Sequence, residues 1–186
     1  MNIGFAMCGS LCTFDAVFPV METVAKTHTL IPILSCAAST IDSRFGPARE
    51  HVQKVADICG RFPLSSIAEV EPIGPKKLLD ALIIAPCTGN TLAKLAHSIA
   101  DSPVTMAAKS HLRNGRPVLI AVSTNDALAG AAENIGKLLA RKHYYFVPFG
   151  QDDPIKKPTS MVADFSKIPE ALALALEGKQ IQPVLL

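Results

Sequence analysis

The sequence predicts one α/β domain, residues 1–186, built in three layers around a mostly parallel six-stranded sheet. Short apolar runs of strand length alternate with segments of helical periodicity along the whole chain, which is typical of parallel sheets. The composition agrees, because 49% hydrophobic and 18% charged residues indicate a large buried fraction. A chain of 186 residues is long enough to bury a full core in a single domain.

The chain opens with a predicted strand, a turn and a helix. The apolar segment Asn2–Met7 is the first strand, and the turn Cys8-Gly9-Ser10 follows it. The next segment, from about Thr13 to Lys26, has helical periodicity. It contains Pro19, which has no N–H to donate, so we expect a kink or a later start of the helix.

The next predicted elements are two short strands with a helix between them. A strand at Leu30–Leu34 contains Pro32, which favours an edge or an irregular position. Small residues at Ser35–Thr40 predict a loop, and Gly46-Pro47 predicts the start of a helix. A short third strand is expected at Ile67–Val70.

The rest of the chain is organised around Leu78–Ala108. Its apolar run Ala81–Ala85 is short and β-branched enough to be a strand buried on both faces. We expect Pro86 to end this strand, because proline cannot donate to a sheet ladder. Small and polar residues follow at Cys87–Thr91, and apolar residues then recur at helical spacing at Leu92, Leu95, Ala96 and Ile99. Such a unit places N–H groups and a positive helix end at the carboxyl edge of the sheet.

Another helix and strand follow. Ser102 and Pro103 suit the N-cap and the first position of a helix that ends near Leu112. The apolar run Pro117–Val122 is a predicted strand, and Ser123–Asp126 is expected to end it and to cap the following helix.

The C-terminal part contains one more predicted strand and one more helix. Tyr144–Phe149 is the last strand, and a final helix covers Ile168–Glu177. Between them, the polar segment Gly150–Pro158 contains two prolines and a change of charge sign. We expect it to be mobile or to fold over a ligand.

Composition argues against several classes of partner. A formal charge of +2 is too small to indicate a nucleic-acid or membrane-surface partner. Aromatic residues make up only 5% of the chain and Trp is absent, so surfaces for stacking bases are scarce. No apolar run reaches the roughly 18 residues of a membrane-spanning helix. We therefore expect neither a nucleic-acid partner nor a membrane.

Cysteine and histidine spacing predicts no metal site. The five cysteines are odd in number and contain no C-x-x-C, and the five histidines lie far apart without zinc-binding spacing. No signal peptide is visible, so a reduced, cytoplasmic setting is expected.

Four predicted strand ends share small hydroxyl, amide or glycine residues: Gly9-Ser10, Ser35, Thr88–Thr91 and Ser123–Asn125. The carboxyl ends of parallel strands meet at one edge, where doubly wound sheets bind ligands. Each cluster alone is equally consistent with helix capping. The four together favour a phosphorylated cofactor, since a phosphate needs many hydrogen-bond donors on short side chains or on the backbone around it. Dinucleotides and ATP are less favoured, because the first turn lacks G-x-G-x-x-G and the chain has no G-x-x-x-x-G-K-S/T.

The central segment narrows the choice of phosphorylated cofactor, because it resembles a known sequence motif. Ala85–Ala96, APCTGNTLAKLA, resembles the A-P-A-S/T-A-N-T-I/L-A-K-L/I/V-A motif of flavin-containing cysteine decarboxylases. It is also similar to the A-P-C-S-M-K-T-L-A motif of flavin prenyltransferases, which belong to the same flavoprotein superfamily. Within that superfamily, the segments MCGSLCTF, SCAASTIDSRFG and GQDDPIKKPTSMVADF resemble the dipicolinate synthase B subunits of spore-forming bacteria.

The resemblance implies a Rossmann-like domain that binds FMN and assembles into trimers or dodecamers. The implied cofactor-binding residues are Gly9, Ser10, Leu11, Ser35, Thr88, Gly89, Asn90, Thr91, Ser123 and Asn125. Of these, Gly9, Ser10 and Ser35 would hold the phosphate. Thr88, Asn90 and Thr91 would face the phosphate, the ribityl chain or the substrate.

The same resemblance implies oxidation of a dihydrodipicolinate-type ring to pyridine-2,6-dicarboxylate (dipicolinate) during sporulation. The flavin could accept the hydride, since a cofactor carries redox chemistry that the protein orients. Alternatively, the implied partner, the nicotinamide-binding A subunit of dipicolinate synthase, transfers the hydride and this chain binds flavin or supports assembly. The catalytic residues are not identified by the sequence.

An FMN-dependent decarboxylase or prenyltransferase is a further alternative, and departures from those motifs count against it. The decarboxylases carry a His shortly before the central strand, where this chain has Pro72–Pro75, and Ala121–Asp126 lacks the Met and Trp of their P-x-M-N-x-x-M-W clamp. The prenyltransferases have an Arg where this chain has Ser123 and a Lys where it has Asn90.

A dianionic product would need positively charged side chains to bind it. The cations considered are Lys109, Arg113, Arg116, Lys156 and Lys157, although most such charges are solvated surface. Cys87 lies in the cofactor turn as a possible nucleophile, but a small packing residue is the more common role for such a thiol.

Overall fold

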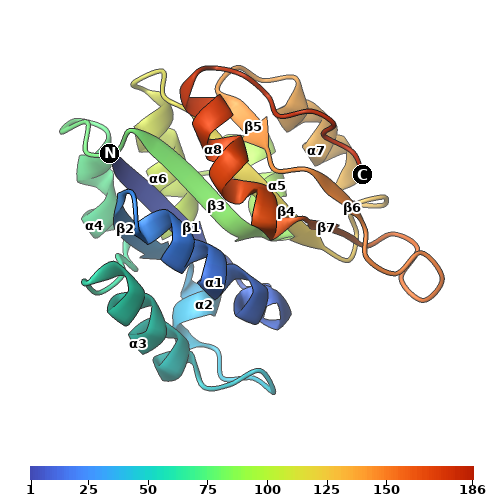
Figure 1. Ribbon diagram of the computed structural model, residues 1–186, viewed down its shortest axis with the longest axis horizontal. Coiled ribbons are helices and arrows are strands. Elements are labelled where there is room, and N and C mark those ends of the chain that lie inside the picture. The colour runs from blue at the N-terminus through green and yellow to red at the C-terminus, as the bar shows by residue number, and fades with distance from the viewer.

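The computed structural model describes residues 1–186 and confirms the α/β class, with a seven-stranded sheet between two layers of helices (Figure 1). The strands are β1 (Asn2–Met7), β2 (Thr29–Leu34), β3 (Ala81–Cys87), β4 (Val118–Thr124), β5 (Tyr144–Phe146), β6 (Phe149–Gln151) and β7 (Met161–Ala163). They lie in the order β2-β1-β3-β4-β7-β6, and β5 also pairs with β4. All pairs among β1 to β5 are parallel, whereas β7 is antiparallel to β4 and β6.

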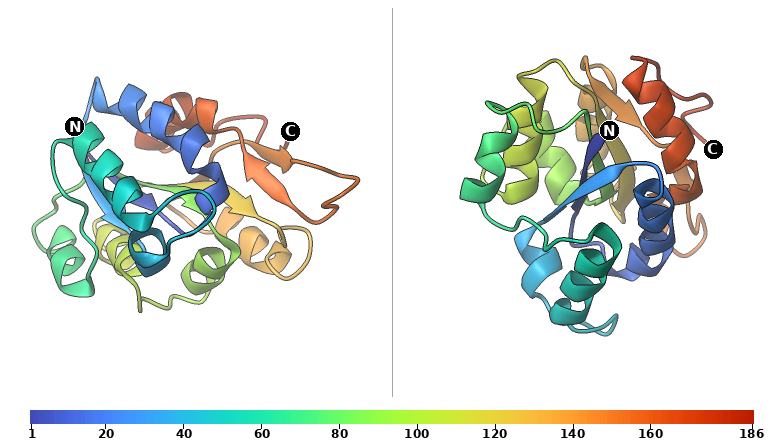
Figure 2. Two further views of the ribbon diagram at one scale, coloured as in Figure 1. Left: turned by 90° about the horizontal axis from the view of Figure 1, so that it is seen from below. Right: turned by 60° about the vertical axis from the view of Figure 1, so that its left-hand side comes forward.

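The helices cover both faces of the sheet (Figure 2). On one face lie α1 (Phe14–Ala25), α3 (Ala48–Cys59) and α8 (Ile168–Leu176). On the other lie α4 (Ile67–Val70), α5 (Gly89–Ala96), α6 (Pro103–Leu112) and α7 (Ala132–Leu139). The short α2 (Cys36–Thr40) follows β2. None of the helices is both long and apolar enough to cross a membrane.

The core is built around β3, all of whose residues are buried. β3 lies between β1 and β4 in the sheet and has a helical layer on each face, which explains its continuous apolar run. The proline-containing β2 is an edge strand, as expected. Pro19 lies inside α1 without ending it, and a 3-10 turn at Leu11–Thr13 precedes that helix.

Two predicted elements were wrong because helical caps override weak local patterns. The expected loop at 35–40 contains α2, and the Ser35 hydroxyl at its N-cap accepts a hydrogen bond from the Ala38 N–H at 3.2 Å. The expected strand at 67–70 is α4. Ser66 and Glu69 form a capping box at its start, a signal present in the sequence as S-x-x-E.

Pro86 does not end the central strand, contrary to expectation. β3 continues to Cys87, and the register of its pairing with β4 shifts between Ile84 and Cys87. The missing N–H of Pro86 falls at this irregularity, while its carbonyl accepts a hydrogen bond from the Cys8 N–H at 3.1 Å. The strand therefore tolerates proline where the ladder is already interrupted.

The C-terminal half differs most from the prediction. Ser123–Asp126 does not cap the following helix, because β4 extends to Thr124 and α7 begins only at Ala132, without a side-chain cap. The expected strand at 144–149 is two strands, β5 and β6. The polar segment after it starts in β6 and returns as β7, which pairs with the end of β4. The predicted helix residue Ile99 lies beyond α5 and is exposed.

A buried histidine makes the packing of α6 sensitive to acid. His111 is 0% exposed, and its Nε2 lies 3.1 Å from the Pro117 carbonyl oxygen, while Nδ1 has no hydrogen-bond partner. Burial lowers the pKa of His111 from 6.5 to about 4. Between these two values the unfolded chain binds a proton at this residue and the native chain does not.

We therefore predict that His111 makes the free energy of unfolding fall as pH decreases from 6.5 to 4. The loss is on the order of 3 kcal/mol, since each pKa unit corresponds to about 1.4 kcal/mol. Urea denaturation across this range should give a shallower pH dependence for His111→Gln, which retains a donor but does not titrate. Parallel curves for the two proteins would contradict this role.

Candidate functional site

A donor-rich depression lies at the carboxyl edge of the sheet, beside the ends of β1, β3 and β4. It has two adjoining hollows with Gly9 and Thr88 in both walls. The first, the β4 hollow, has a volume of about 560 Å³, and its predicted residues are Ser10, Leu11, Ser123 and Asn125. The second, the β2 hollow, measures about 420 Å³, and its predicted residues are Ser35, Asn90 and Thr91. The structure thus brings every residue predicted to bind the cofactor to this depression, except Gly89.

Gly89 lies at the start of α5, against the end of β4, and does not line either hollow. A Cβ at this position would lie 2.6 Å from Asp126 Oδ1 and 2.8 Å from Thr124 Oγ1. The lack of a side chain at Gly89 therefore permits close approach of α5 to β4. A direct contact between Gly89 and a cofactor stays a prediction.

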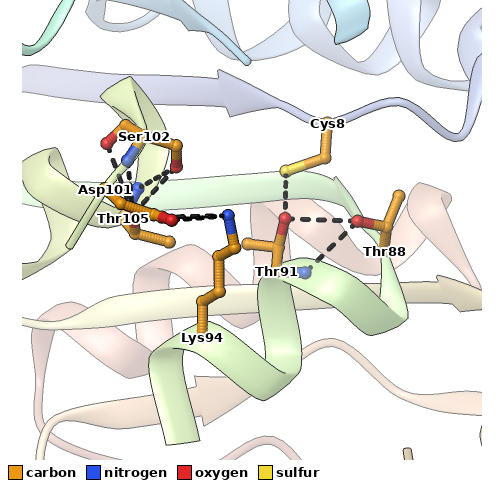
Figure 3. A network of polar contacts seen from close by, with 7 residues as sticks. All are labelled: Cys8, Thr88, Thr91, Lys94, Asp101, Ser102 and Thr105. Atoms are coloured by element: carbon orange, nitrogen blue, oxygen red, sulfur yellow. Dashed lines mark hydrogen bonds and ion pairs between the residues drawn. The ribbon is translucent and has the colours of Figure 1, made fainter. Parts of the chain in front are cut away.

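The start of α5 is tied to the end of β1 by a polar network (Figure 3). Thr88, the N-cap residue, accepts a hydrogen bond from the Thr91 N–H at 3.4 Å, and the two hydroxyl oxygens are 3.2 Å apart. The Thr91 hydroxyl donates to Cys8 Sγ at 3.2 Å. Other N–H groups of the first helical turn have no intrahelical acceptor, and they give this end a partial positive charge. An anion is favoured here.

The turn after β1 adds further donors on the other side of the depression. The Gly9 N–H has no acceptor within the protein. A Cβ on Gly9 would lie 2.9 Å from the Ala37 Cβ, so only glycine lets this turn approach α2 so closely. Ser10 Oγ lies 2.8 Å from Ser123 Oγ and thereby links the ends of β1 and β4.

The β6–β7 hairpin forms one wall of the β4 hollow. Its residues Asp152, Lys157 and Ser160 line the hollow, and the sequence alone had not assigned Asp152 or Ser160 to a site. The hairpin contacts Asn125 twice: Thr159 Oγ1 donates to the Asn125 carbonyl at 2.7 Å, and Ser160 Oγ lies 3.4 Å from Asn125 Oδ1. The polar composition of 150–158 and the family resemblance of the segment GQDDPIKKPTSMVADF were the signals in the sequence that could have indicated this wall.

The five basic residues that the sequence suggested for binding a dianionic ligand lie in different parts of the structure. Lys109 and Arg113 line a different hollow, between α5, α6 and β5. Arg116 lies near the amino end of β3, where it donates to the carbonyls of Lys77 and Leu79 and lies 3.5 Å from Asp80. Of the five, Lys157 alone lines the β4 hollow, and none lines the β2 hollow.

The cysteines differ sharply in access to this depression. Cys87 is 0% exposed, and burial raises the pKa of its thiol well above the ordinary value, which fits a packing role. Hydrogen bonds from Cys87 and Thr91 lower the pKa of the buried Cys8 thiol. Cys12 and Cys36 are exposed and line the β4 and β2 hollows. No group of His, Cys, Asp or Glu side chains is arranged to hold a metal ion.

Sequence comparison gives relatives over almost the whole chain. The family described as Flavoprotein matches residues 1–169. The B subunit of dipicolinate synthase from Bacillus subtilis (strain 168) is 45% identical over 185 residues, which cover 99% of this chain and 92% of that protein.

Structural comparison agrees. The crystal structure of the dipicolinate synthase B subunit from Bacillus halodurans C matches with a TM-score of 0.91 and 44% identity, covering 100% of this chain and 95% of that chain. The FMN-dependent cysteine decarboxylase SpaF matches with a TM-score of 0.69 and 24% identity, covering 94% of this chain and 97% of that chain. The likeness to SpaF concerns the fold alone.

The exposure of the cysteines predicts a labelling pattern for the free protein. Cys12 and Cys36 should react rapidly with a maleimide, whereas Cys8 and Cys87 should react only after denaturation, because their sulfur atoms are shielded from solvent. Mass spectrometry of peptides after timed labelling measures this order. Rapid labelling of Cys87 in the native protein would contradict its burial and revive a nucleophilic role.

Proposed function

The chain belongs to the flavoprotein family, and on this basis we propose that it binds FMN as one component of a dipicolinate synthase. The proposed reaction is oxidation of a dihydrodipicolinate-type ring to the aromatic pyridine dicarboxylate. One observation supports FMN binding most strongly: hydrogen-bond donors on short side chains and on the backbone at three strand ends lie together beside the N-terminus of α5.

The donor set fits the phosphate of a mononucleotide. The Gly9 N–H and the Ser10 hydroxyl lie at the end of β1, and Ser35 lies at the end of β2. Thr88 and the free first-turn N–H groups of α5 add donors and a favourable dipole. We assign the phosphate to these groups and the ribityl chain to Asn90, an exposed residue that lines the β2 hollow.

The size of the depression also supports a ligand larger than a phosphate ion. The adjoining hollows of about 560 and 420 Å³ each lie in the range of small-molecule sites. FMN bound there would supply a ring that accepts a hydride. The protein's own groups would hold the phosphate, orient the ring against the substrate and keep the substrate at the rim of β4.

A partner protein is part of the proposal. The names of the two similar proteins denote a B subunit, which implies a corresponding A subunit. We propose that this A subunit is the nicotinamide-binding protein expected from the family resemblance, that this chain assembles with it during sporulation, and that copies of this chain form a trimer or dodecamer. The partner could then reoxidise the flavin or itself take the hydride.

An anaerobic half-reaction tests the redox role. If the flavin accepts the hydride, mixing the FMN-loaded chain with dihydrodipicolinate should bleach the flavin absorption in a single turnover, either alone or with the A subunit. The aromatic product, which has no hydride to give, is the control and should leave the spectrum unchanged.

The opposite result would assign the redox step to the partner. Unbleached flavin, together with nicotinamide reduction that needs both proteins, would show that this chain does not carry the hydride. Decarboxylation of a cysteinyl peptide, with no dipicolinate formed in either assay, would replace the proposal with the decarboxylase alternative.

A further inference from the structure

The β4 hollow contains one charged group of each sign. Asp152 is its single carboxylate and Lys157 its single Lys or Arg side chain. The adjoining β2 hollow has no carboxylate, and its Lys94 is paired with Asp101 at 2.9 Å. An ion pair between a ligand in the β4 hollow and a side chain that lines it therefore involves Asp152 or Lys157.

The pair is held in place by the β6–β7 hairpin. Lys157 Nζ lies 3.2 Å from Asp152 Oδ2, and the two side chains are 55% and 27% exposed. The hydroxyl of Ser160, which is itself buried, holds the pKa of Asp152 below its usual range. β7 pairs with the end of β4, and the Leu128 N–H donates to the Thr159 carbonyl at 3.0 Å. Both charges thus lie in the wall of the β4 hollow, on a hairpin that is tied to the end of β4.

A flat apolar group lines the same hollow. Phe45 lines the hollow and is 43% exposed. It lies on a loop in which the backbone N–H of Ser43 donates to the Gly46 carbonyl and that of Gly46 donates to the Ser43 carbonyl, both at 3.1 Å. His51 Nε2 lies 3.0 Å from the Phe45 carbonyl, and the His51 ring packs against Phe14 with centroids 5.1 Å apart. The loop is therefore anchored to the core, and Phe45 lines the hollow with the Arg44 guanidinium 4.8 Å from the centroid of its ring.

We propose that the β4 hollow is a substrate subsite for a ring that carries N–H hydrogen next to a carboxylate. Lys157 donates to the ligand carboxylate, Asp152 accepts from the ring N–H, and Phe45 packs against the ring. The ligand replaces one exposed ion pair, which contributes little to stability, with two charge-assisted hydrogen bonds. This inference rests on the proposed function, since FMN in the adjoining space would face such a ring.

The subsite distinguishes a reduced ring from an aromatic one. Aromatisation of a 1,2- or 1,4-dihydropyridine ring removes a hydride from a ring carbon, which the flavin would accept, and a proton from the ring nitrogen, which the Asp152 carboxylate can accept. The aromatic nitrogen keeps a lone pair, which faces the Asp152 carboxylate unfavourably. The aromatic product is consequently bound less tightly than a ring that keeps its N–H. Asp152 therefore discriminates between the two ring states, whereas Lys157 binds both through their carboxylates.

Two stable probes test this discrimination by calorimetry on the FMN-loaded protein. Piperidine-2,6-dicarboxylate carries N–H hydrogens on a ring nitrogen that is protonated at neutral pH, and pyridine-2,6-dicarboxylate carries none. The wild-type protein should bind the piperidine probe about tenfold more tightly, the usual scale of one charge-assisted hydrogen bond. Asp152→Asn should reduce this ratio to about threefold or less.

The lysine variants provide a matched pair. Lys157→Gln should weaken binding of both probes by about tenfold and leave their ratio nearly unchanged. The adjacent Lys156→Gln removes the same charge from a residue outside the hollow, and it should leave both affinities unchanged. Circular dichroism and thermal unfolding verify that each variant is folded.

Each failure has a separate meaning. If FMN binds but the wild type binds the two probes equally or not at all, or if Lys156→Gln and Lys157→Gln act alike, the subsite is wrong and the cofactor assignment stands. If FMN itself does not bind to the wild type, the proposed function fails first, and titration with FMN alone detects that case.

Discussion

The parallel pairing of β1, β3 and β4 is the constraint on which the site depends. Because the three strands run in the same direction, their carboxyl ends place Gly9-Ser10, Thr88 and Ser123 beside one another. The 2.8 Å contact between Ser10 and Ser123 joins residues 113 positions apart in the sequence. A register change in either pair would move these donors and α5 apart. The core and the proposed cofactor site are therefore specified by the same hydrogen-bond ladder.

The sequence was most informative where one strong local signal acts alone. β1 and α6 agree with their predicted bounds, since an unbroken apolar run and an N-cap Ser before Pro103 each leave one favourable structure. The prediction from the sequence failed where the local signal was short or where two local signals favoured different structures. α4 has only four residues, so its apolar character resembled a strand, and the capping box at Ser66 and Glu69 decided the outcome. β6 and β7 have three residues each, too few for a periodicity.

The site was predictable in part for a similar physical reason. Hydroxyl and glycine residues directly after strands can be located from the sequence alone, and all of those singled out except Gly89 line the depression. Groups brought there by long-range folding left no local signal. Phe45 reaches the hollow from the loop before α3, and Asp152 from a hairpin that pairs with β4. Charge pattern could not separate Lys157 from Lys109 or Arg113, because that separation depends on packing.

The most direct test of the central claim is a titration of the purified chain with FMN, followed by flavin fluorescence. We predict saturable binding for the wild type, an affinity about tenfold lower for Ser10→Ala, which loses a donor to the phosphate, and no change for Ser65→Ala, an exposed serine that lines neither hollow. Absence of saturable binding by the wild type, also in the complex with its partner, or equal affinities for the wild type and Ser10→Ala would contradict the account.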